Sequence, residues 1–347
     1  MKNKENKLFQ SVKEYLTVYL PKQKNASSLT VKTYRESLNQ FITYLAIEKN
    51  AALYTVTFDD ITQESITAYL SYISDKKQCG TSTRNIRLSA IRAFLKYVGS
   101  KDAVINAVYL AARNVPFRKD KKERTVLHFS EGALETMLKQ PDPKKKTQHR
   151  DLFFMILLYD TGARNSEMLN LTPVDIVTKG TSPYVVINGK GQKIRTVPIM
   201  EKTVAHFHSY IKRMGLKADD DTTPLFYTII HGVKCRMSDD NVARFIDKYA
   251  ALARTECDEV PYNVTPHMWR HSRAIHLYRK GMPLPLISEW LGHSNLETTL
   301  IYAYADTEMK RTAIEKATAD NHPLRKQQVQ NHDKEDDDTI RQFYGLK

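Results

Sequence analysis

Cysteine is scarce in this 347-residue chain, and its positions suit neither a metal site nor a disulfide framework. The three cysteines, Cys79, Cys235 and Cys257, lie far apart and form no CxxC pair, so we expect reduced, structural thiols. Long apolar runs are missing as well. None reaches the roughly 18 residues that cross a bilayer, and no apolar signal core follows the charged N-terminus. These absences predict a cytoplasmic protein.

Acidic residues are outnumbered by basic ones. The chain has 53 Lys and Arg residues against 39 Asp and Glu residues, which gives a formal net charge of +14. Such a charge attracts a large anion at long range, and nucleic acid is the commonest partner of this kind. Charge alone does not choose among DNA, RNA and an acidic membrane. The length favours two domains over one.

The first part of the chain, residues 1–113, has the spacing of short amphipathic helices. Behind the candidate cap Ser27, apolar residues recur every three or four positions: Val31, Tyr34, Leu38, Phe41 and Leu45. Similar stripes begin at Leu8, at Ile66 and near Gly80. We therefore predict a small all-α domain of four helices.

Beyond residue 113 the chain changes character three times. Residues 114–129 lack periodicity and are mostly basic, which indicates a linker able to follow a phosphate backbone. Residues 130–319 are mainly helical but contain Asn188-Gly189-Lys190-Gly191 between β-branched runs, a strong hairpin signal. Residues 320–347 form a charged tail. The predicted fold class is α+β, mainly α with a small β-sheet.

Two segments of the second domain offer cations for phosphate chemistry. A side chain that cleaves a phosphodiester needs cations around the phosphate and a proton donor for the departing oxygen. Arg164 follows Gly162, which is expected to end an apolar helix, so its guanidinium can fork onto two phosphate oxygens from a turn. His267 and Arg270 lie in the first turn of a helix that begins at Thr265, where free backbone N–H groups favour an anion.

The candidate nucleophile is Tyr302. Upstream of it, His293 lies at the entrance of a helix for which Ser294 and Glu297 form a capping box. Tyr302 follows His293 by nine residues. One straight helix would place the two on opposite faces and about 12 to 14 Å apart along its axis. We therefore expect a helix break or a mobile tyrosine segment between them.

Taken together, these residues resemble the catalytic set of the tyrosine recombinases, also called phage integrases. The similarity lies in the order and short-range spacing of six residues: Arg164, Lys190, His267, Arg270, His293 and Tyr302. The second domain resembles the catalytic domain of that family. The helical front domain resembles its core-binding domain more loosely.

The resemblance implies a reaction that needs no metal, ATP or other cofactor. Tyr302 would attack the scissile phosphate to give a 3′-phosphotyrosine and a free 5′-hydroxyl. His267 would assist proton transfer from the phenol, which is mostly protonated at neutral pH. Lys190 would protonate the leaving oxygen.

The remaining residues of the set would bind the phosphate and stabilise its negative charge. The resemblance implies that Arg164 and Arg270 hold it and stabilise the transition state. It also implies that His293 donates to a phosphate oxygen. Glu167 resembles a residue that orients this cluster.

The resemblance also implies a partner, double-stranded DNA with inverted-repeat core sites. The protein would bind as a dimer on each site and as a tetramer in the synapse. Further DNA contacts are predicted for basic residues of the fourth helix, which may equally face solvent, and of the linker: Arg84, Arg87, Arg92, Arg118 and Lys119. The charged tail favours integration and excision of a mobile element over Xer-like dimer resolution.

Several alternatives stay open. Tyr304 competes for the role of nucleophile and Lys193 for that of the acid. His267 and His271 are spaced as in helical zinc sites, but the glutamate of HExxH is missing, so His271 is expected to form structural hydrogen bonds. A type IB topoisomerase would share the chemistry. A regulator with an inactive site would share only the DNA binding.

Overall fold

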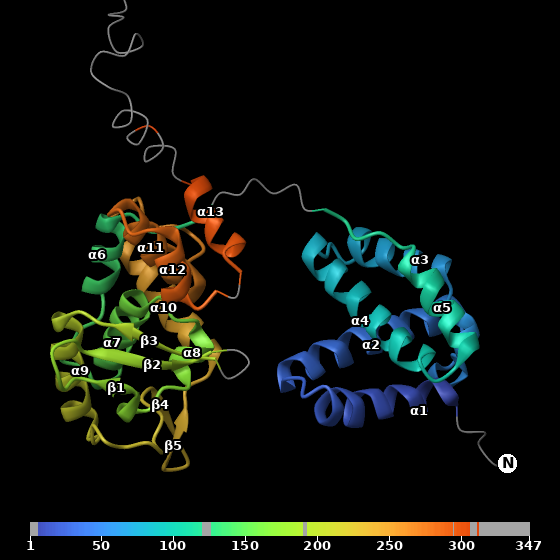
Figure 1. Ribbon diagram of the computed structural model, residues 1–347, viewed down its shortest axis with the longest axis horizontal. Coiled ribbons are helices and arrows are strands. Elements are labelled where there is room, and N and C mark those ends of the chain that lie inside the picture. Colours follow the sequence, from blue (N-terminus) through green and yellow to red (C-terminus); the bar gives the residue numbers. More distant parts are fainter. Residues whose placement is uncertain (1–5, 120–125, 190–192, 294, 306–310, 312–347) are drawn as a thin grey trace, which may run out of the picture. The chain divides into compact units, whose positions relative to one another are not determined.

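Figure 1 shows the computed structural model of the chain, which describes residues 6–119, 126–189, 193–293, 295–305 and 311. The chain divides into two compact units, Met1–Glu123 and Arg124–Lys347. The division falls inside the predicted linker. The finer domain bounds stay predictions, and the charged tail lies outside the described residues.

The first unit is built from helices. Its elements are α1 (Lys7–Glu14), the π-helix η1 (Tyr15–Gln23), α2 (Ser28–Glu48), the 3-10 turns η2 (Leu53–Thr55) and η3 (Phe58–Asp60), α3 (Gln63–Asp75), α4 (Thr81–Gly99) and α5 (Ala103–Arg113). Polar side chains fix where the helices start. Ser27 accepts a hydrogen bond from the backbone N–H of Thr30, and Asp102 accepts one from that of Val104.

Helix α5 has no counterpart among the four predicted helices. Its core-facing residues Ile105, Val108, Tyr109 and Ala112 recur every three or four positions and pack on the core of the unit, a stripe that the prediction of four helices left out. The first predicted helix also differs, since α1 continues into a π-helix that contains Pro21. Proline has no N–H to donate, which accounts for a break in the regular α-helical hydrogen bonds here.

The second unit combines helices with two small antiparallel sheets (Figure 1). Its helices are α6 (Glu131–Lys139), α7 (Lys146–Thr161), α8 (Asn165–Leu169), the 3-10 turn η4 (Pro173–Asp175), α9 (Glu201–Met214), α10 (Asp239–Ala253), α11 (Pro266–Arg279), α12 (Leu284–Leu291) and α13 (Glu297–Ala305). Its strands are β1 (Ile176–Val177), β2 (Tyr184–Asn188), β3 (Ile194–Pro198), β4 (Tyr227–Ile230) and β5 (Val233–Arg236). Within the described ranges, no helix is long and apolar enough to span a membrane.

The predicted hairpin is confirmed as β2 and β3. The two strands pair from Tyr184 with Pro198 to Asn188 with Ile194. β1 adds a third strand on the other side of β2. A second hairpin, β4 and β5, has no counterpart in the prediction. Its turn residues His231 and Gly232 both have positive φ, a conformation that a non-glycine such as His231 rarely adopts.

Helix α7 forms the centre of the second unit's core. Its residues Phe153 and Phe154 are fully buried, and both pack on the ring of Phe226 with centroids 5.7 and 4.8 Å apart. On α11, Trp269 is fully buried against Phe129, with ring centroids 5.1 Å apart. Both helices are therefore held firmly by apolar packing; α11 carries residues of the site described below, and α7 ends just before Arg164.

Gly162 ends α7 in a left-handed conformation with φ +59, as the sequence predicts. A Cβ at this position would lie 2.9 Å from Cδ2 of Leu291. We expect Gly162→Ala to lower the free energy of unfolding by about 1 to 3 kcal/mol, because backbone strain and a steric clash act together. Urea denaturation of the purified chain measures this change.

Gly215 is the matched control for that substitution. It ends α9 with φ +65, but a Cβ there meets nothing within 4 Å. Gly215→Ala should therefore show the backbone strain alone, about 1 kcal/mol. Equal losses for the two variants would mean that the contact with Leu291 relaxes freely.

Candidate active site

Arg164 lies in the turn between α7 and α8, where the sequence predicts it. Its side chain is 34% exposed, and Nη1 donates a hydrogen bond to Oε1 of Glu167 at 2.9 Å. The backbone N–H of Arg164 donates to Oε2 of the same carboxylate, also at 2.9 Å. Glu167 therefore fixes both the backbone and the side chain of Arg164, which leaves the rest of the guanidinium facing solvent.

Glu167 also binds a second arginine, Arg195 on β3. Arg195 Nη2 donates to Oε2 at 2.8 Å, and Arg195 Nε donates to the carbonyl oxygen of Trp290 at 3.1 Å. Burial alone would raise the pKa of Glu167, but the hydrogen bonds from Arg195 and from the Arg164 N–H outweigh it and lower the pKa. The carboxylate is therefore ionised at neutral pH and joins α8, β3 and the end of α12.

Arg195 is absent from the predicted set of site residues. A signal for it exists, because Arg195 lies two residues before the fully buried Val197 on the same strand and hence on the same face. An arginine on the buried face of a strand requires an anionic partner.

Arg270 lies in the first two turns of α11 and is almost completely buried, with 2% of its surface exposed. Its Nη1 donates to the carbonyl oxygen of Gly162 at 2.7 Å, and its Nη2 donates to that of Leu291 at 2.6 Å. Burial, followed by repulsion from Arg164, lowers its pKa to about 10. It remains charged at neutral pH, and it connects the ends of α7 and α12 to α11.

The two histidines of the predicted set lie beside these arginines. His293 is half-buried, and its Nδ1 is 2.8 Å from Oγ1 of Thr299. Burial, then the charges of Arg270 and Arg164, lowers the pKa of His293 to about 4. The pKa of His267 is lowered as well, by desolvation and by the charges of the same two arginines. Both rings are therefore neutral at pH 7 before any anion binds.

Tyr302 lies on α13 and is 1% exposed. The predicted break is present, because α12 ends at Leu291 and α13 begins at Glu297. The predicted capping residue Ser294 lies outside the described residues, and the N–H of Glu297 donates to Asn295 Oδ1 at 3.0 Å. Burial raises the pKa of the Tyr302 phenol to about 12, although Arg270 and Arg164 act in the opposite direction.

The hydrogen-bond partner of the Tyr302 phenol is His271, whose Nδ1 lies 3.0 Å from the phenolic oxygen. The predicted role of His267 in proton transfer from the phenol stays a prediction. The two histidines are one helical turn apart, with ring centroids separated by 5.5 Å. His271 is the one nearer α13 because it lies one turn further along α11. No spacing rule could have chosen between them.

Lys190, the predicted acid, lies outside the described residues, but the strand ends that flank it are described. Gly189 N–H donates to the carbonyl oxygen of Lys193 at 2.8 Å. A Cβ built on Gly189 would lie 3.5 Å from Oε1 of Glu167. The β2–β3 hairpin therefore lies beside Glu167 and Arg195 at Gly189, one residue before Lys190. Lys193, the competing candidate for the acid, is exposed and lies directly before the first residue of β3.

In the first unit, two of the predicted DNA-contacting arginines are engaged inside the unit. Arg84 is 4% exposed and donates to the carbonyl oxygen of Pro116 at 3.2 Å. Arg92 donates to the carbonyl oxygens of Ala112 and Arg113 at 3.0 and 2.8 Å. These side chains hold the end of α5 and the segment that follows it, and their predicted contacts with DNA stay predictions.

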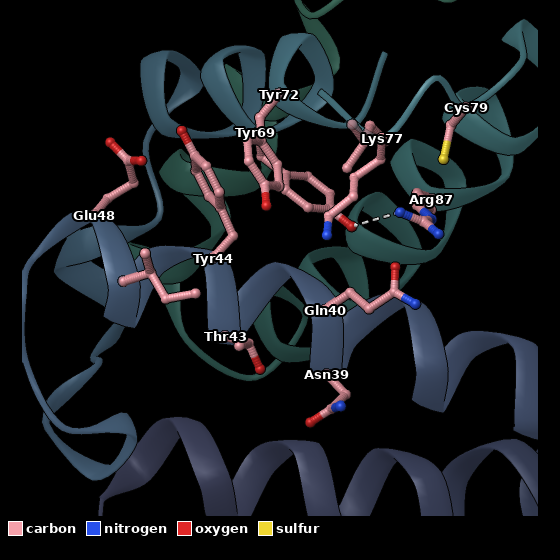
Figure 2. A pocket seen from close by; sticks show the side chains of 12 residues that line it. Asn39, Gln40, Thr43, Tyr44, Glu48, Tyr69, Tyr72, Lys77, Cys79 and Arg87 are labelled. Atoms are coloured by element: carbon pink, nitrogen blue, oxygen red, sulfur yellow. Dashed lines mark hydrogen bonds between the residues drawn. The ribbon is translucent and has the colours of Figure 1, made fainter. Parts of the chain in front are cut away.

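The other three predicted contacts stay predictions. Arg118 and Lys119 are exposed. Arg87 borders a cleft of about 560 Å³ between α2, α3 and the start of α4, and it donates to the hydroxyl of Tyr69 at 3.4 Å (Figure 2). Amide side chains from α2, Asn39 and Gln40, line the opposite wall.

Comparison with known families covers both units. The model of the phage integrase family matches residues 128–309, and that of the N-terminal SAM-like domain of phage integrases matches residues 12–101. Tyrosine recombinase XerC of Thermodesulfovibrio yellowstonii is 30% identical over 88% of this chain and 94% of its own length. Tyrosine recombinase XerA of Pyrococcus furiosus is 32% identical over 82% of this chain and 96% of its own length. A putative integrase/recombinase, y4rC of Sinorhizobium fredii, is 27% identical over 86% of this chain and 88% of its own length.

Solved structures have the same fold. The XerH site-specific recombinase in a post-cleavage complex with its difH substrate superposes with a TM-score of 0.66 at 21% identity, covering 91% of this chain and 90% of XerH. The Tn1549 transposon integrase in complex with transposon right end DNA superposes with a TM-score of 0.65 at 18% identity, covering 88% of this chain and 98% of the integrase chain. The mainly α fold with a small sheet is thus confirmed.

Proposed function

The chain belongs to the phage integrase family of tyrosine recombinases, and from this premise we propose that it exchanges DNA strands at specific sites with Tyr302 as its nucleophile. One observation carries the assignment of the residues. The charges of Arg164 and Arg270 act on the side chains of Tyr302, His267 and His293 alike. Side chains spread over almost 140 residues are thus close enough to influence one another electrostatically, which supports a common position for the phosphate.

Strand cleavage is a displacement at phosphorus. The phenolic oxygen of Tyr302 forms a bond to phosphorus, the bond to the 5′ oxygen breaks, and a 3′-phosphotyrosine remains. Arg164 and Arg270 are charged at neutral pH and stabilise the negative charge on the phosphate oxygens, each worth about 100-fold or more in rate. Lys190 gives its proton to the departing 5′ oxygen. A 5′-hydroxyl from a second duplex reverses these steps, so no external energy source is required.

The two arginines are preorganised for this role in different ways. Arg270 is held by hydrogen bonds to two carbonyl oxygens, which supports a role as a fixed phosphate donor. Arg164 is fixed by Glu167 but keeps part of its guanidinium exposed to an incoming strand. Fixed donors stabilise a transition state without reorganising during the reaction, which is why their geometry determines the rate.

We further propose that four protomers act on two inverted-repeat sites and that the natural reaction integrates and excises a mobile element. The structural neighbours XerH and Tn1549 integrase were solved bound to their DNA substrates, which supports DNA as the partner. Resolution of chromosome or plasmid dimers is the second candidate. It is favoured by the similarity to XerC and XerA over almost their entire lengths.

A covalent-capture experiment tests the proposed function. The full chain is incubated with nicked duplexes that have a randomised core, the mixture is denatured, and DNA that stays attached to protein is sequenced. We expect enrichment of inverted half-sites. Their positions in the genome then distinguish the ends of a mobile element from a single chromosomal resolution site.

Two labelled duplexes that carry the captured site complete the test. We expect recombinant products in which the labels are exchanged. Relaxation of a supercoiled plasmid without exchange would identify a topoisomerase instead. Tight binding with no covalent adduct would identify a regulator, and either outcome contradicts the proposal.

A further inference from the structure

The phenol of Tyr302 has His271 as its hydrogen-bond partner. Nδ1 of His271 lies 3.0 Å from the phenolic oxygen, and the two rings meet edge to face with centroids 5.7 Å apart. Because Tyr302 is 1% exposed, bulk water has little access to this oxygen. A proton that leaves the phenol during attack on phosphorus must therefore pass to a neighbouring side chain, and His271 is in place to receive it.

His271 is also in the right protonation state. Burial, followed by the charges of the neighbouring His267, Arg270 and His128, lowers its pKa to about 4. These groups on α11 and on the segment before α6, together with Tyr302 on α13, are the titratable and charged groups that face it. A neutral imidazole that is protonated at Nε2 has a free lone pair at Nδ1. The phenolic O–H can donate a hydrogen bond to this lone pair.

His267 has a different environment. Its pKa is lowered by desolvation and then by the charges of Arg270 and Arg164, the two arginines proposed to hold the phosphate. It lies at the start of α11, one turn before His271, and its ring is exposed. This places His267 on the phosphate side of the site and His271 on the nucleophile side.

We propose that His271 accepts the proton of the Tyr302 phenol during strand cleavage and returns it during rejoining, an inference that rests on the function proposed above. As the bond from the phenolic oxygen to phosphorus forms, the O–H bond breaks and the proton moves to Nδ1, which leaves an imidazolium. The 5′ oxygen departs with a proton from a separate acid. In the reverse step the bond between phosphorus and the tyrosine oxygen breaks, and the imidazolium protonates that oxygen. The incoming phosphate offsets the positive charges of Arg164 and Arg270, which makes the imidazolium tolerable.

The test measures single-turnover cleavage of a captured site in which sulfur replaces the bridging 5′ oxygen. A thiolate leaves without an acid, so only the nucleophile side limits this substrate. At pH 7 we expect His271→Ala to cleave it about 100-fold to 10,000-fold more slowly than wild type, whereas Lys190→Ala should cleave it at close to the wild-type rate. If sulfur rescued His271→Ala as it rescues Lys190→Ala, His271 would act on the leaving group and the proposal would be wrong.

The dependence of the rate on pH separates proton transfer from structural support. Without an internal acceptor the reaction depends on phenolate that is already present. Its fraction rises about tenfold with each pH unit below the phenol pKa. We expect the His271→Ala rate to rise in this way between about pH 7 and pH 9 and to increase when imidazole is added, while the wild-type rate stays nearly flat over that range because Arg270 remains mostly charged. A uniform reduction at every pH would mean that His271 only supports the structure, which overturns the proposal.

Two further variants guard against loss of folding and against failure of the premise. His271→Asn keeps a polar atom near the Nδ1 position but cannot hold the proton, so it should fold and bind the site yet show the same rise with pH. His208→Ala, an exposed histidine on α9, should behave like wild type. Absence of cleavage by wild type would refute the proposed function itself, whereas normal cleavage by His271→Ala would refute only this inference.

Discussion

Tyr302→Phe should abolish covalent attachment of the chain to DNA while leaving DNA binding nearly unchanged. The substitution removes one oxygen atom from a side chain that is 1% exposed, so the ring keeps its packing on α13. The lost hydrogen bond to His271 Nδ1 costs about 1 kcal/mol of stability, too little to unfold the unit. Without the phenolic oxygen no bond to phosphorus can form. Gel analysis after denaturation measures the adduct on a nicked captured site, and a mobility shift measures binding.

Tyr304→Phe is the matched control for this prediction. Tyr304 lies two residues further along α13 and competes with Tyr302 as a nucleophile by sequence alone. It should form the adduct at the wild-type rate. Adduct formation that survives Tyr302→Phe and disappears with Tyr304→Phe would move the nucleophile by two residues and overturn the assignment of the site.

Glu167→Ala should lower both stability and cleavage. Glu167 is 5% exposed and accepts hydrogen bonds from Arg195 and from both the backbone and the side chain of Arg164. Its removal leaves the largely buried Arg195 without an anion, which is expected to cost about 3 kcal/mol of unfolding free energy. Arg164 then loses its fixed position, and cleavage should fall by about 100-fold. Urea denaturation and single-turnover cleavage measure the two effects.

The stability effect of Glu167→Ala should depend on pH in a defined direction. The pKa of Glu167 is lowered in the folded chain, so its carboxylate stabilises the fold above the unfolded pKa near 4.5. That contribution is lost as the pH falls through the folded value. The difference between wild type and Glu167→Ala should therefore be full at neutral pH and shrink in acid. A difference that stays constant down to low pH would mean that lost packing, not lost charge, is the cause.

Glu135→Ala provides the control for charge removal at the surface. Glu135 pairs with Lys139 at 2.7 Å, but both side chains are about two-thirds exposed. Exposed pairs contribute less than about 1 kcal/mol because water screens them. The contrast between the two variants isolates the effect of burial on a carboxylate with arginine partners.

Local patterns predicted much of the fold in advance. The β2–β3 hairpin, the glycine that ends α7 and the start of α11 after Thr265 were all readable, because turns and helix ends depend on residues adjacent in sequence. The β4–β5 hairpin was not, because its apolar residues Ile229 and Val233 are exposed and show no alternation with buried residues. Helix α5 was missed although Ile105, Val108 and Ala112 lie on one buried face. Burial is a property of the folded chain, and the pattern reveals it only when one face is consistently apolar.

The sequence by itself determined the chemical groups of the site and their order along the chain, from Arg164 to Tyr302. It determined them because family motifs are short, and each depends on residues within one turn or one helix start. Only the tertiary structure decided which groups touch. It brought Arg195 of β3 to Glu167, and it placed Nδ1 of His271 within hydrogen-bond distance of the Tyr302 phenol. Contacts between separate elements depend on how α8, β3, α11 and α13 pack, and that packing is a collective result of the buried core that no local spacing encodes.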